Sequence, residues 1–433
     1  MSLLHQKSGE TVDSGLDIFS VPPTQTSIDS GGYVEYFPLA VLNQSTNIEF
    51  DISNNNGSEY LDLANTFISV RAKIVKSDDS VCPDTPTYAP VNNWVHALFS
   101  QIDCYLNGIL VTQSENTYPY KAYIESLLSY DGETKRSQLS SGMFYKDTAH
   151  KFEQIADNSG MLQRHARSKQ SQEVDMIGRL HCDIMNMNRY ILNGVGVKLR
   201  LVKSKDAFNI FTVGDETYKT VITHISVFCR KCALNPSAFL AHGRVLSSES
   251  AKYPLKRASV RPYSIPAGSL TSTQDNLFLS QLPNRIIIGL VDSEAYNGSF
   301  TKNPFNFQHF DLTYISLYIN GTQHPRTPIQ PNFKDKRFAR PFYSLFSDLG
   351  LGSKNEGNDL SFDEYDGGNT LYVFDLSPSI LDGNQIELVK SGSLRFEMKF
   401  GKALPKAVHV LVYAELDSMI EITKGREIVT DYS

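Results

Sequence analysis

The sequence predicts an all-β fold built from two similar β-sandwiches in tandem. Three observations support this prediction: short runs of β-branched and aromatic residues separated by Asn, Gly, Pro and Ser, a hairpin sequence that occurs twice, and a shared order of elements around both copies. A chain of 433 residues is long enough for two cores of about 200 residues each. We therefore expect about eight strands in each half, with one helix after each hairpin.

The repeated hairpin is the clearest element. Its first strand alternates apolar and polar residues, as in a strand with one face in a core, and the apolar set is Ile102, Cys104 and Leu106. Asn107-Gly108 follows, and both residue types tolerate the positive φ of a tight turn. Asn320-Gly321 ends the same pattern in the second half. The copies share Ile-x-x-Tyr-(Leu/Ile)-Asn-Gly at an offset of 213 residues (315 minus 102).

An amphipathic helix is predicted after each hairpin. From Pro119, a favourable first-turn residue, apolar residues recur with helical spacing until Asp131-Gly132. These residues are Tyr120, Tyr123, Ile124, Leu127 and Leu128. A second helical apolar run covers residues 341–350.

The remaining strands occur in the same order in both halves. In the first half we expect strands at 33–38, 46–52, 66–76, 176–185, 196–203 and 220–230. In the second half, 284–293 matches 65–75 at an offset of 219 (284 minus 65). The segments 370–376, 393–400 and 407–416 match the last three strands of the first half. Recurrence of several elements in order indicates an internal duplication.

Composition indicates the domain boundaries. Residues 1–32 are mostly polar and are expected to form an arm that docks on the body or on a neighbour, or a disordered tail. Residues 33–232 form the first sandwich, with an insertion loop at 139–173 that contains some helix and lies at an exposed edge. Residues 233–248 are a connector, and 249–433 form the second sandwich.

Charge and cysteine content exclude several functional classes. A formal charge of −6 provides no general affinity for nucleic acids or acidic membranes. No apolar run approaches the roughly 20 residues of a membrane helix, and we expect no signal peptide. Five cysteines without a secretory signal are expected to be reduced thiols. We expect a protein made inside a cell, without membrane insertion.

His181-Cys182-Asp183 is the strongest candidate for chemistry. His-x-Asp followed by a distant His is the facial-triad pattern of Fe(II) oxygenases, and His224 or His242 is available as third ligand. On a strand, however, the core-facing set would be Leu180, Cys182 and Ile184. That alternation places His181 and Asp183 on the outer face, and the matching strand of the second half has no His.

Other motifs are weaker. Cys229-x-x-Cys232 has no second pair, and residues three apart on a strand face opposite sides, so inert thiols are the preferred interpretation. The basic runs at 164–169, 252–261 and 334–340 lack interleaved aromatic residues, so solvated loops or subunit contacts are expected.

The acidic segment 353–369 fits no EF-hand loop. We therefore predict no catalytic, cofactor-binding or metal-binding residues. The residues with a specific structural role are Asn107, Gly108, Asn320 and Gly321, in the two hairpin turns.

Three stretches resemble the hexon-like major capsid proteins of adintoviruses and of Polinton (Maverick) elements. They are SGLDIFSVPPTQTSID (14–29), EYLDLANTFISVRAKIV (59–75) and YLNGILVTQSENTYPYKAYIESLLSYDGETKRSQL (105–139). The resemblance covers essentially the whole chain and is most specific from Leu16 to Leu139. It implies a double jelly roll, with two eight-stranded jelly-roll sandwiches side by side.

The resemblance also implies a structural function in a virion capsid, with no catalytic residues. Three chains would form a pseudo-hexagonal capsomer of an icosahedral shell. The implied partners are two further copies of the chain, neighbouring capsomers and a penton or minor capsid protein, without specific binding of nucleic acid.

Two alternatives from other functional classes stay open at this point. One is a jelly-roll Fe(II) oxygenase that uses His181 and Asp183. The other is an attachment protein that binds glycans through exposed aromatic residues on loops. Against the second, Tyr118, Tyr120 and Tyr123 have the spacing of a buried helix face, and Trp94 is expected to be a buried anchor.

Overall fold

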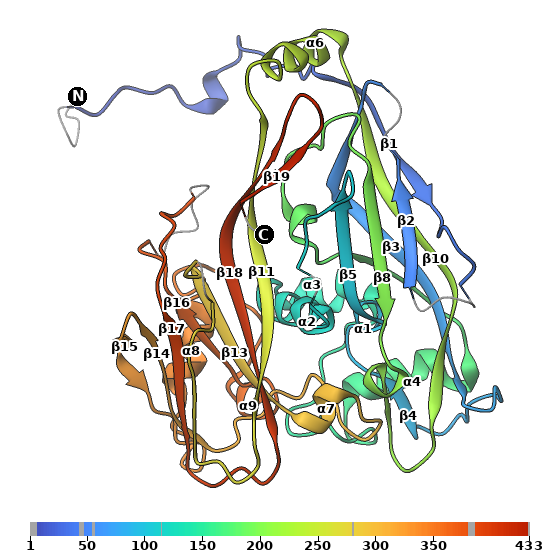
Figure 1. The fold of residues 1–433 in the computed structure, drawn as a ribbon, viewed down its shortest axis with the longest axis vertical. Coiled ribbons are helices and arrows are strands. Elements are labelled where there is room, and N and C mark those ends of the chain that lie inside the picture. The colour runs from blue at the N-terminus through green and yellow to red at the C-terminus, as the bar shows by residue number, and fades with distance from the viewer. Residues whose placement is uncertain are drawn as a thin grey trace.

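The computed structural model describes residues 7–42, 47–53, 57–113, 115–278, 281–379 and 386–431, and these form two jelly rolls side by side (Figure 1). Within the described residues, each half has two sheets with four strands of common order; β19 adds a fifth strand in the second half, and β4 and β9 form a separate pair in the first. Counted along those eight strands, one sheet has the order first, eighth, third, sixth, and the other has the order second, seventh, fourth, fifth. Both halves share this order, so the predicted double jelly roll is confirmed.

The first jelly roll is formed by strands β1 to β10. Its first sheet contains β1 (Ile28–Tyr36), β10 (Tyr218–Leu234), β3 (Glu59–Lys76) and β7 (Val174–Arg179). Its second sheet contains β2 (Asn47–Ile52), β8 (Val197–Lys203), β5 (Phe99–Leu106) and β6 (Ile109–Leu110). The short strands β4 (Tyr88–Pro90) and β9 (Ile210–Thr212) pair with each other.

The second jelly roll is formed by strands β11 to β19. Its first sheet contains β11 (Ala251–Ile265), β18 (Val408–Ile422), β13 (Arg285–Asp292) and β16 (Leu371–Asp375), with β19 (Ile428–Thr430) paired to β18. Its second sheet contains β12 (Thr271–Gln274), β17 (Leu394–Phe400), β14 (Leu312–Ile319) and β15 (Thr322–Ile329).

Helices occupy the loops and the space between the jelly rolls (Figure 1). The α-helices are α1 (Trp94–Ala97), α2 (Tyr118–Ser129), α3 (Gly132–Arg136), α4 (Ser159–Ser168), α5 (Asp206–Asn209), α6 (Pro236–Val245), α7 (Ser293–Asn297), α8 (Ala339–Ser347) and α9 (Phe362–Asp366). The 3-10 helices are η1 (Ser14–Leu16), η2 (Gln138–Gly142), η3 (Lys169–Ser171) and η4 (Asp183–Asn186). No helix in the described part of the chain is long and apolar enough to cross a membrane.

The sheet β11-β18-β13-β16 is apolar on both faces. Ile286, Ile288 and Leu290 of β13 belong to the core inside the second jelly roll. Ile287 and Val291, which alternate with them, belong to the core that continues into the first jelly roll. The interface between the two jelly rolls is therefore packed like a protein interior.

The predicted match of 284–293 to 65–75 pairs equivalent strands, β13 and β3, but the alignment between them is shifted by one residue. An offset of 219 pairs Ile68, which faces the core of the first jelly roll, with Ile287, which faces away from the core of the second. Since side chains alternate along a strand, an error of one residue exchanges the two faces. Equivalent inward positions are therefore separated by an even offset.

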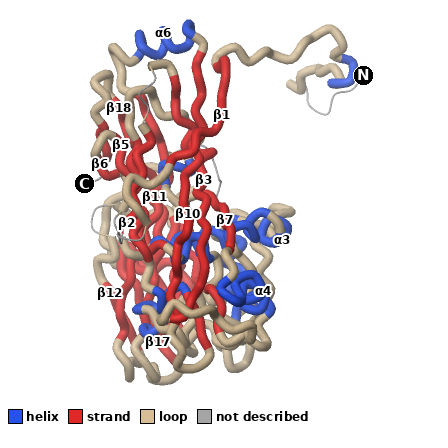
Figure 2. Tube along the Cα trace, turned by 90° about the vertical axis from the view of Figure 1, so that its right-hand side faces the viewer, coloured by secondary structure: helices blue, strands red, loops and turns tan. Residues whose placement is uncertain are grey.

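Two predicted strand boundaries are also wrong. β1 begins at Ile28, inside the segment expected to be the arm, because residues from Ile28 onward pair with β10. β7 ends at Arg179, so the strand expected to reach residue 185 stops before His181. Residues 7–27 are exposed and extend away from the two jelly rolls (Figure 2).

The segment 139–173 contains the helix that was predicted, α4, and it combines exposed residues with a set of buried polar ones. Arg164 of α4 is fully buried, and its guanidinium donates hydrogen bonds to Asp147 (2.7 Å), Pro90 O (2.8 Å) and Tyr145 O (2.6 Å). His165 is buried beside it. The interpretation of the basic run 164–169 as a solvated loop or subunit contact is therefore wrong at both residues, because their cationic and imidazole groups satisfy buried acceptors.

Candidate functional site

Helix α2 is the central element between the two jelly rolls. The sequence favours a helix here because Pro119 occupies the first turn and apolar residues follow at intervals of three and four. Tyr123 stacks on Phe305 of the second jelly roll, with ring centroids 4.3 Å apart, and Tyr120 stacks on Tyr296 at 5.8 Å. The predicted burial of Tyr118, Tyr120 and Tyr123 is confirmed. Trp94 is buried as predicted.

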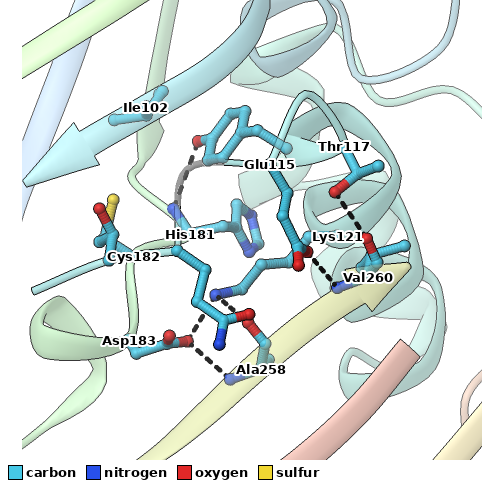
Figure 3. A pocket seen from close by; sticks show the side chains of 12 residues that line it. Ile102, Glu115, Thr117, Lys121, His181, Cys182, Asp183, Ala258 and Val260 are labelled. Carbon is cyan, nitrogen blue, oxygen red and sulfur yellow. Dashed lines mark hydrogen bonds and ion pairs between the residues drawn. The ribbon is translucent and has the colours of Figure 1, made fainter. Parts of the chain in front are cut away.

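A buried ion pair joins α2, η4 and β11 (Figure 3). Lys121 Nζ lies 2.5 Å from Asp183 Oδ1 and also donates to Ala258 O at 3.3 Å. The Ala258 backbone N–H donates to the same carboxylate oxygen at 3.2 Å. Burial alone would lower the pKa of Lys121, but the charges of Asp183 and Glu125 outweigh it and hold that pKa above its ordinary value. The ammonium group is therefore charged and fixed.

A second pair lies beside the first. His181 Nδ1 is 2.6 Å from Glu125 Oε2, and the Tyr413 hydroxyl of β18 donates to Glu125 Oε1 at 3.3 Å. Burial opposes ionisation of Glu125, yet the hydrogen bond from His181 and the charge of Lys121 hold its pKa below the ordinary value. Burial lowers the pKa of His96, which packs against His181, well below its ordinary value. His96 is therefore neutral near pH 7.

Glu115 and Thr117, which directly precede α2, complete the contact with β11. Glu115 accepts hydrogen bonds from Ser259 Oγ (3.2 Å) and Val260 N (3.2 Å), and Thr117 Oγ1 donates to Val260 O at 3.0 Å (Figure 3). The cavity enclosed by these groups measures about 30 Å³. This is room for about two water molecules. A larger, open groove of about 980 Å³ is also lined by Glu125, His181 and Asp183. The charged cluster itself fixes the two domains together.

The structure corrects the predicted placement of His181 and Asp183. They do not lie on an exposed outer strand face, because the chain leaves β7 and turns into η4, and the second jelly roll covers both side chains. His224 lies on the outward face of β10 beside Phe37, and His242 of α6 bonds to the Tyr60 hydroxyl at 3.1 Å. The facial triad is thus not assembled. In the part of the chain that the structure describes, no group of three or more His, Cys, Asp or Glu is arranged to hold a metal.

The five cysteines are buried free thiols. Burial raises the pKa of Cys182 to about 12 and that of Cys229 to about 11. Cys229 belongs to the hydrophobic core, while Cys232, on the same strand, lies outside that cluster. Such thiols are poor nucleophiles because nucleophilic attack requires the thiolate.

A second polar contact joins the jelly rolls on the other side of α2. Lys146 pairs with Glu364 (2.7 Å) and Asp359 (3.2 Å). Lys135 of α3 donates to Leu127 O at 2.6 Å and to Asn358 O. The acidic segment 353–369 thus contributes carboxylates and a backbone carbonyl that accept hydrogen bonds from two lysines of the first jelly roll.

The two Asn-Gly turns have matching geometry. Asn107 and Gly108 have φ of 45° and 83°, and Asn320 and Gly321 have φ of 50° and 80°. Asn107 Oδ1 accepts from Gly196 N at 2.8 Å, and Asn320 Oδ1 accepts from Ser393 N at 2.9 Å. Each side chain therefore ties the turn to the residue preceding the seventh strand of its own jelly roll. Asn107 Nδ2 also donates to Arg426 O of the second jelly roll at 2.9 Å.

Neither of the other two basic runs forms a continuous cationic surface. Residues 252–261 are part of β11, where Arg257 is nearly buried. Residues 334–340 precede and begin α8 and are mostly exposed. The residues that the sequence left unnoticed are Lys121, Glu125, Glu115, Lys135 and Lys146.

The chain is similar to proteins that share its fold. No family model matches the sequence. An uncharacterised protein of Caenorhabditis elegans, F54H12.2, is 27% identical over 425 residues, which cover 95% of this chain and 99% of that protein.

Among solved structures, a chain of the Sputnik virophage has a TM-score of 0.63 at 10% identity and covers 99% of this chain and 94% of its own. The faustovirus major capsid protein has a TM-score of 0.58 at 8% identity, with coverage of 95% and 92%. The mavirus major capsid protein has a TM-score of 0.52 at 11% identity, with coverage of 100% and 97%. Similarity at this identity shows the shared fold over the full length.

Proposed function

We propose that this chain is a structural major capsid protein that forms trimeric, pseudo-hexameric capsomers of an icosahedral shell. The observation that carries the proposal is the duplication itself: two jelly rolls of one topology are fixed against each other by a buried interface. Three such chains present six similar units around one axis, which lets one gene product tile a surface. Its location is then the virion, and its partners are further copies, neighbouring capsomers and a penton or minor capsid protein.

The comparisons support this proposal in two ways. The solved structures with the same fold over the full length include proteins described as the major capsid proteins of mavirus and faustovirus. The relative at 27% identity belongs to an animal, as expected of a gene carried by an integrated element. Within this proposal, the adintovirus or Polinton type of capsid protein is the one that the sequence resemblance implies.

The geometry of the charged cluster favours a structural role over catalysis. An iron oxygenase would need His181 and Asp183 as metal ligands, whereas they pair with Glu125 and Lys121. An open groove of about 980 Å³ runs past both residues, but among the described residues no third ligand joins them in a metal-binding group. We propose that the protein is not an enzyme and uses no cofactor.

The test is assembly of the purified chain. Light scattering coupled to size-exclusion chromatography should give three times the mass of one chain, and negative-stain microscopy should show pseudo-hexagonal particles with three-fold symmetry. A chain that stays monomeric under every condition of salt, pH and concentration tried would reject the proposal.

A further inference from the structure

An open groove lies along the seam between the two jelly rolls. It measures about 980 Å³, and its walls come from residues 179–189 of the first jelly roll and from 254–258 and 413–417 of the second. A groove of about 480 Å³ adjoins it at the end of α2 and shares Tyr130 and Lys354 with it. We call the two together the seam groove. An elongated depression of this kind fits an extended segment of chain.

The accessible charge of the larger groove is positive. Its four carboxylates are held inside the chain by partners of their own: Asp183 by Lys121, Glu125 by His181, Glu415 by Arg285 and Asp417 by the backbone N–H of Glu387. The four cationic side chains of its wall are exposed, and they are Arg179, Arg189, Lys256 and Lys354. This distribution favours an anionic occupant.

The deeper wall of the groove is apolar. Leu180, Met187 and Leu255 line it and are nearly buried, and Ile386, which also lines it, is 51% exposed. Cationic side chains with long apolar stems stand beside these residues. The matching occupant therefore alternates carboxylates with apolar side chains.

The arm, residues 7–27, has this composition. It carries three carboxylates, Glu10, Asp13 and Asp17, against the single cation Lys7. Its apolar side chains are held out in solvent, with Phe19 94% exposed. The others are Val12, Leu16, Ile18 and Val21, each at least 69% exposed. Large apolar side chains that stay exposed together on one short segment indicate a docking segment.

We propose that the seam groove binds the arm of another copy of this chain. In Figure 2 the arm leaves the body on the side of β7 and α3, which both contribute to the walls of the groove. Yet residues 7–27 are exposed throughout in the single chain. A fully extended arm of this length spans up to about 70 Å, so it reaches well beyond its own body.

The inference rests on the proposed function and adds a tie between copies to it. Each copy supplies one arm and one seam groove, so every groove can be filled in any closed assembly. Burial of Phe19 and its neighbours offsets the entropy lost when the arm is ordered. The competing occupant is the arm of the same copy.

A photo-crosslinking amino acid in place of Phe19 of the full-length chain identifies the binding surface. Mixing isotopically labelled and unlabelled chains before assembly distinguishes contacts between copies from contacts within one. Mass spectrometry of assembled, irradiated protein should find crosslinks to peptides from 179–189, 254–258 or 349–357 of another copy. Crosslinks confined to one copy, crosslinks to other surfaces, or no crosslink in assembled protein would overturn the proposal.

Charge reversal in the same probe-bearing chain gives a second readout. Asp17→Lys on the arm and Arg179→Glu in the groove should each lower the crosslink yield by about fivefold or more, because attraction becomes repulsion. Both residues are exposed, so thermal unfolding should change little. Asp51→Lys is the matched control: Asp51 is an exposed carboxylate of β2 outside the groove, and its reversal should leave the yield unchanged.

The outcomes separate this inference from the proposed function. If the unmodified chain forms trimers and all three charge variants crosslink equally well, the seam groove is the wrong site while the capsid function stands. If the unmodified chain never assembles, the proposed function itself fails.

Discussion

The first sheets of the two jelly rolls, β1-β10-β3-β7 (the open sheet) and β11-β18-β13-β16 (the covered sheet), share a strand order and differ in what their outward faces carry. On β13 of the covered sheet, Ile287 and Val291 face the first jelly roll and are buried. On β3 of the open sheet, the outward positions include Ser69, Arg71 and Lys73, and Arg71 is exposed. The inward positions of both strands are apolar. The fold therefore requires apolar residues on the inward face of each sheet. The polarity of the outward face depends on whether another domain packs against it.

This difference explains how one chain can hold two similar domains in a fixed relation. A sheet buried on both faces loses its strict alternation of apolar and polar residues, as the run IIIGLV at 286–291 does. A sheet with a mixed outward face stays compatible with water before it meets a partner. The covered sheet is therefore buried within every copy of the chain.

The largest expected effect contrasts two ion pairs: the buried pair of α2 and η4 that packs against the covered sheet, and an exposed pair on the open sheet. Lys121→Met leaves the Asp183 carboxylate buried without its cation and should lower the free energy of unfolding by about 3–5 kcal/mol. Arg71→Met breaks the exposed pair with Asp175 and should cost less than about 1 kcal/mol. Denaturant unfolding of the two variants measures the difference.

A double variant sharpens this comparison. Asp183→Asn added to Lys121→Met removes the unpaired charge and should restore part of the lost stability, because the cost comes from the isolated carboxylate. If the single Lys121→Met variant unfolds at the same denaturant concentration as the unmodified chain, the ion pair does not hold the jelly rolls together.

The next effect concerns apolar residues on the outward faces of the two sheets. Ile287→Ala removes side-chain atoms packed between the jelly rolls and should cost about 2–4 kcal/mol. Ile177→Ala on the open sheet, where Ile177 is 40% exposed, should cost less than about 1 kcal/mol in the monomer. Thermal unfolding of both variants at one protein concentration tests the contrast. Equal losses would mean that the two outward faces are equally covered.

Local periodicity in the sequence was sufficient to predict the repeated framework. The alternation of Ile102, Cys104 and Leu106 and the helical spacing from Pro119 depend on residues close in the chain, and both elements occur where expected. The recurrence of the strands along both halves was visible in the same way, whereas their arrangement in jelly-roll sheets was implied by the family resemblance.

The charged cluster could not be predicted from such patterns. Lys121 and Glu125 are four residues apart on one helix, a spacing typical of a solvated pair, and their partners come from η4 and β18. In the sequence, Arg164 looks like one residue of a basic run on the surface. Its three acceptors, Asp147 and the carbonyls of Pro90 and Tyr145, are distant in the chain and are known only from the structure. Only the run IIIGLV carried a signal, because an uninterrupted apolar strand indicates burial on both faces.

The pH dependence of stability should distinguish two buried lysines at the interface. Lys121 faces carboxylates, whereas Lys135 donates to the carbonyls of Leu127 and Asn358. Burial, reinforced by the charge of Lys146, lowers the pKa of Lys135 from its ordinary 10.5 to about 7. Between these two values the unfolded chain binds more protons at this residue than the folded chain does, so stability rises with pH, by up to about 1.4 kcal/mol per unit.

Lys135→Met removes this contribution. The difference in unfolding free energy between the unmodified chain and Lys135→Met should grow in favour of the unmodified chain as the pH rises from about 7 to about 10, by about 2 kcal/mol or more. Comparing the variant with the unmodified chain cancels the other groups that titrate in this range. A constant difference across the range would show that Lys135 is protonated in the folded chain.

The smallest expected effect is a difference in stability between equivalent substitutions in the two Asn-Gly turns. Both asparagines use Oδ1 to accept a backbone N–H, and Asn107 also donates through Nδ2 to Arg426 O. Asn107→Asp keeps the acceptor and loses this donor, so it should cost about 1 kcal/mol more than Asn320→Asp, which keeps the acceptor toward Ser393. Denaturant unfolding at pH 7 measures both. Arg426→Ala keeps the backbone carbonyl that accepts from Asn107 and removes only the side-chain bonds of Arg426 to Asn193, so it serves as the control for those bonds. If Asn320→Asp costs as much as Asn107→Asp, the bond to Arg426 contributes nothing, and the two hairpins are equivalent in energy as well as in shape.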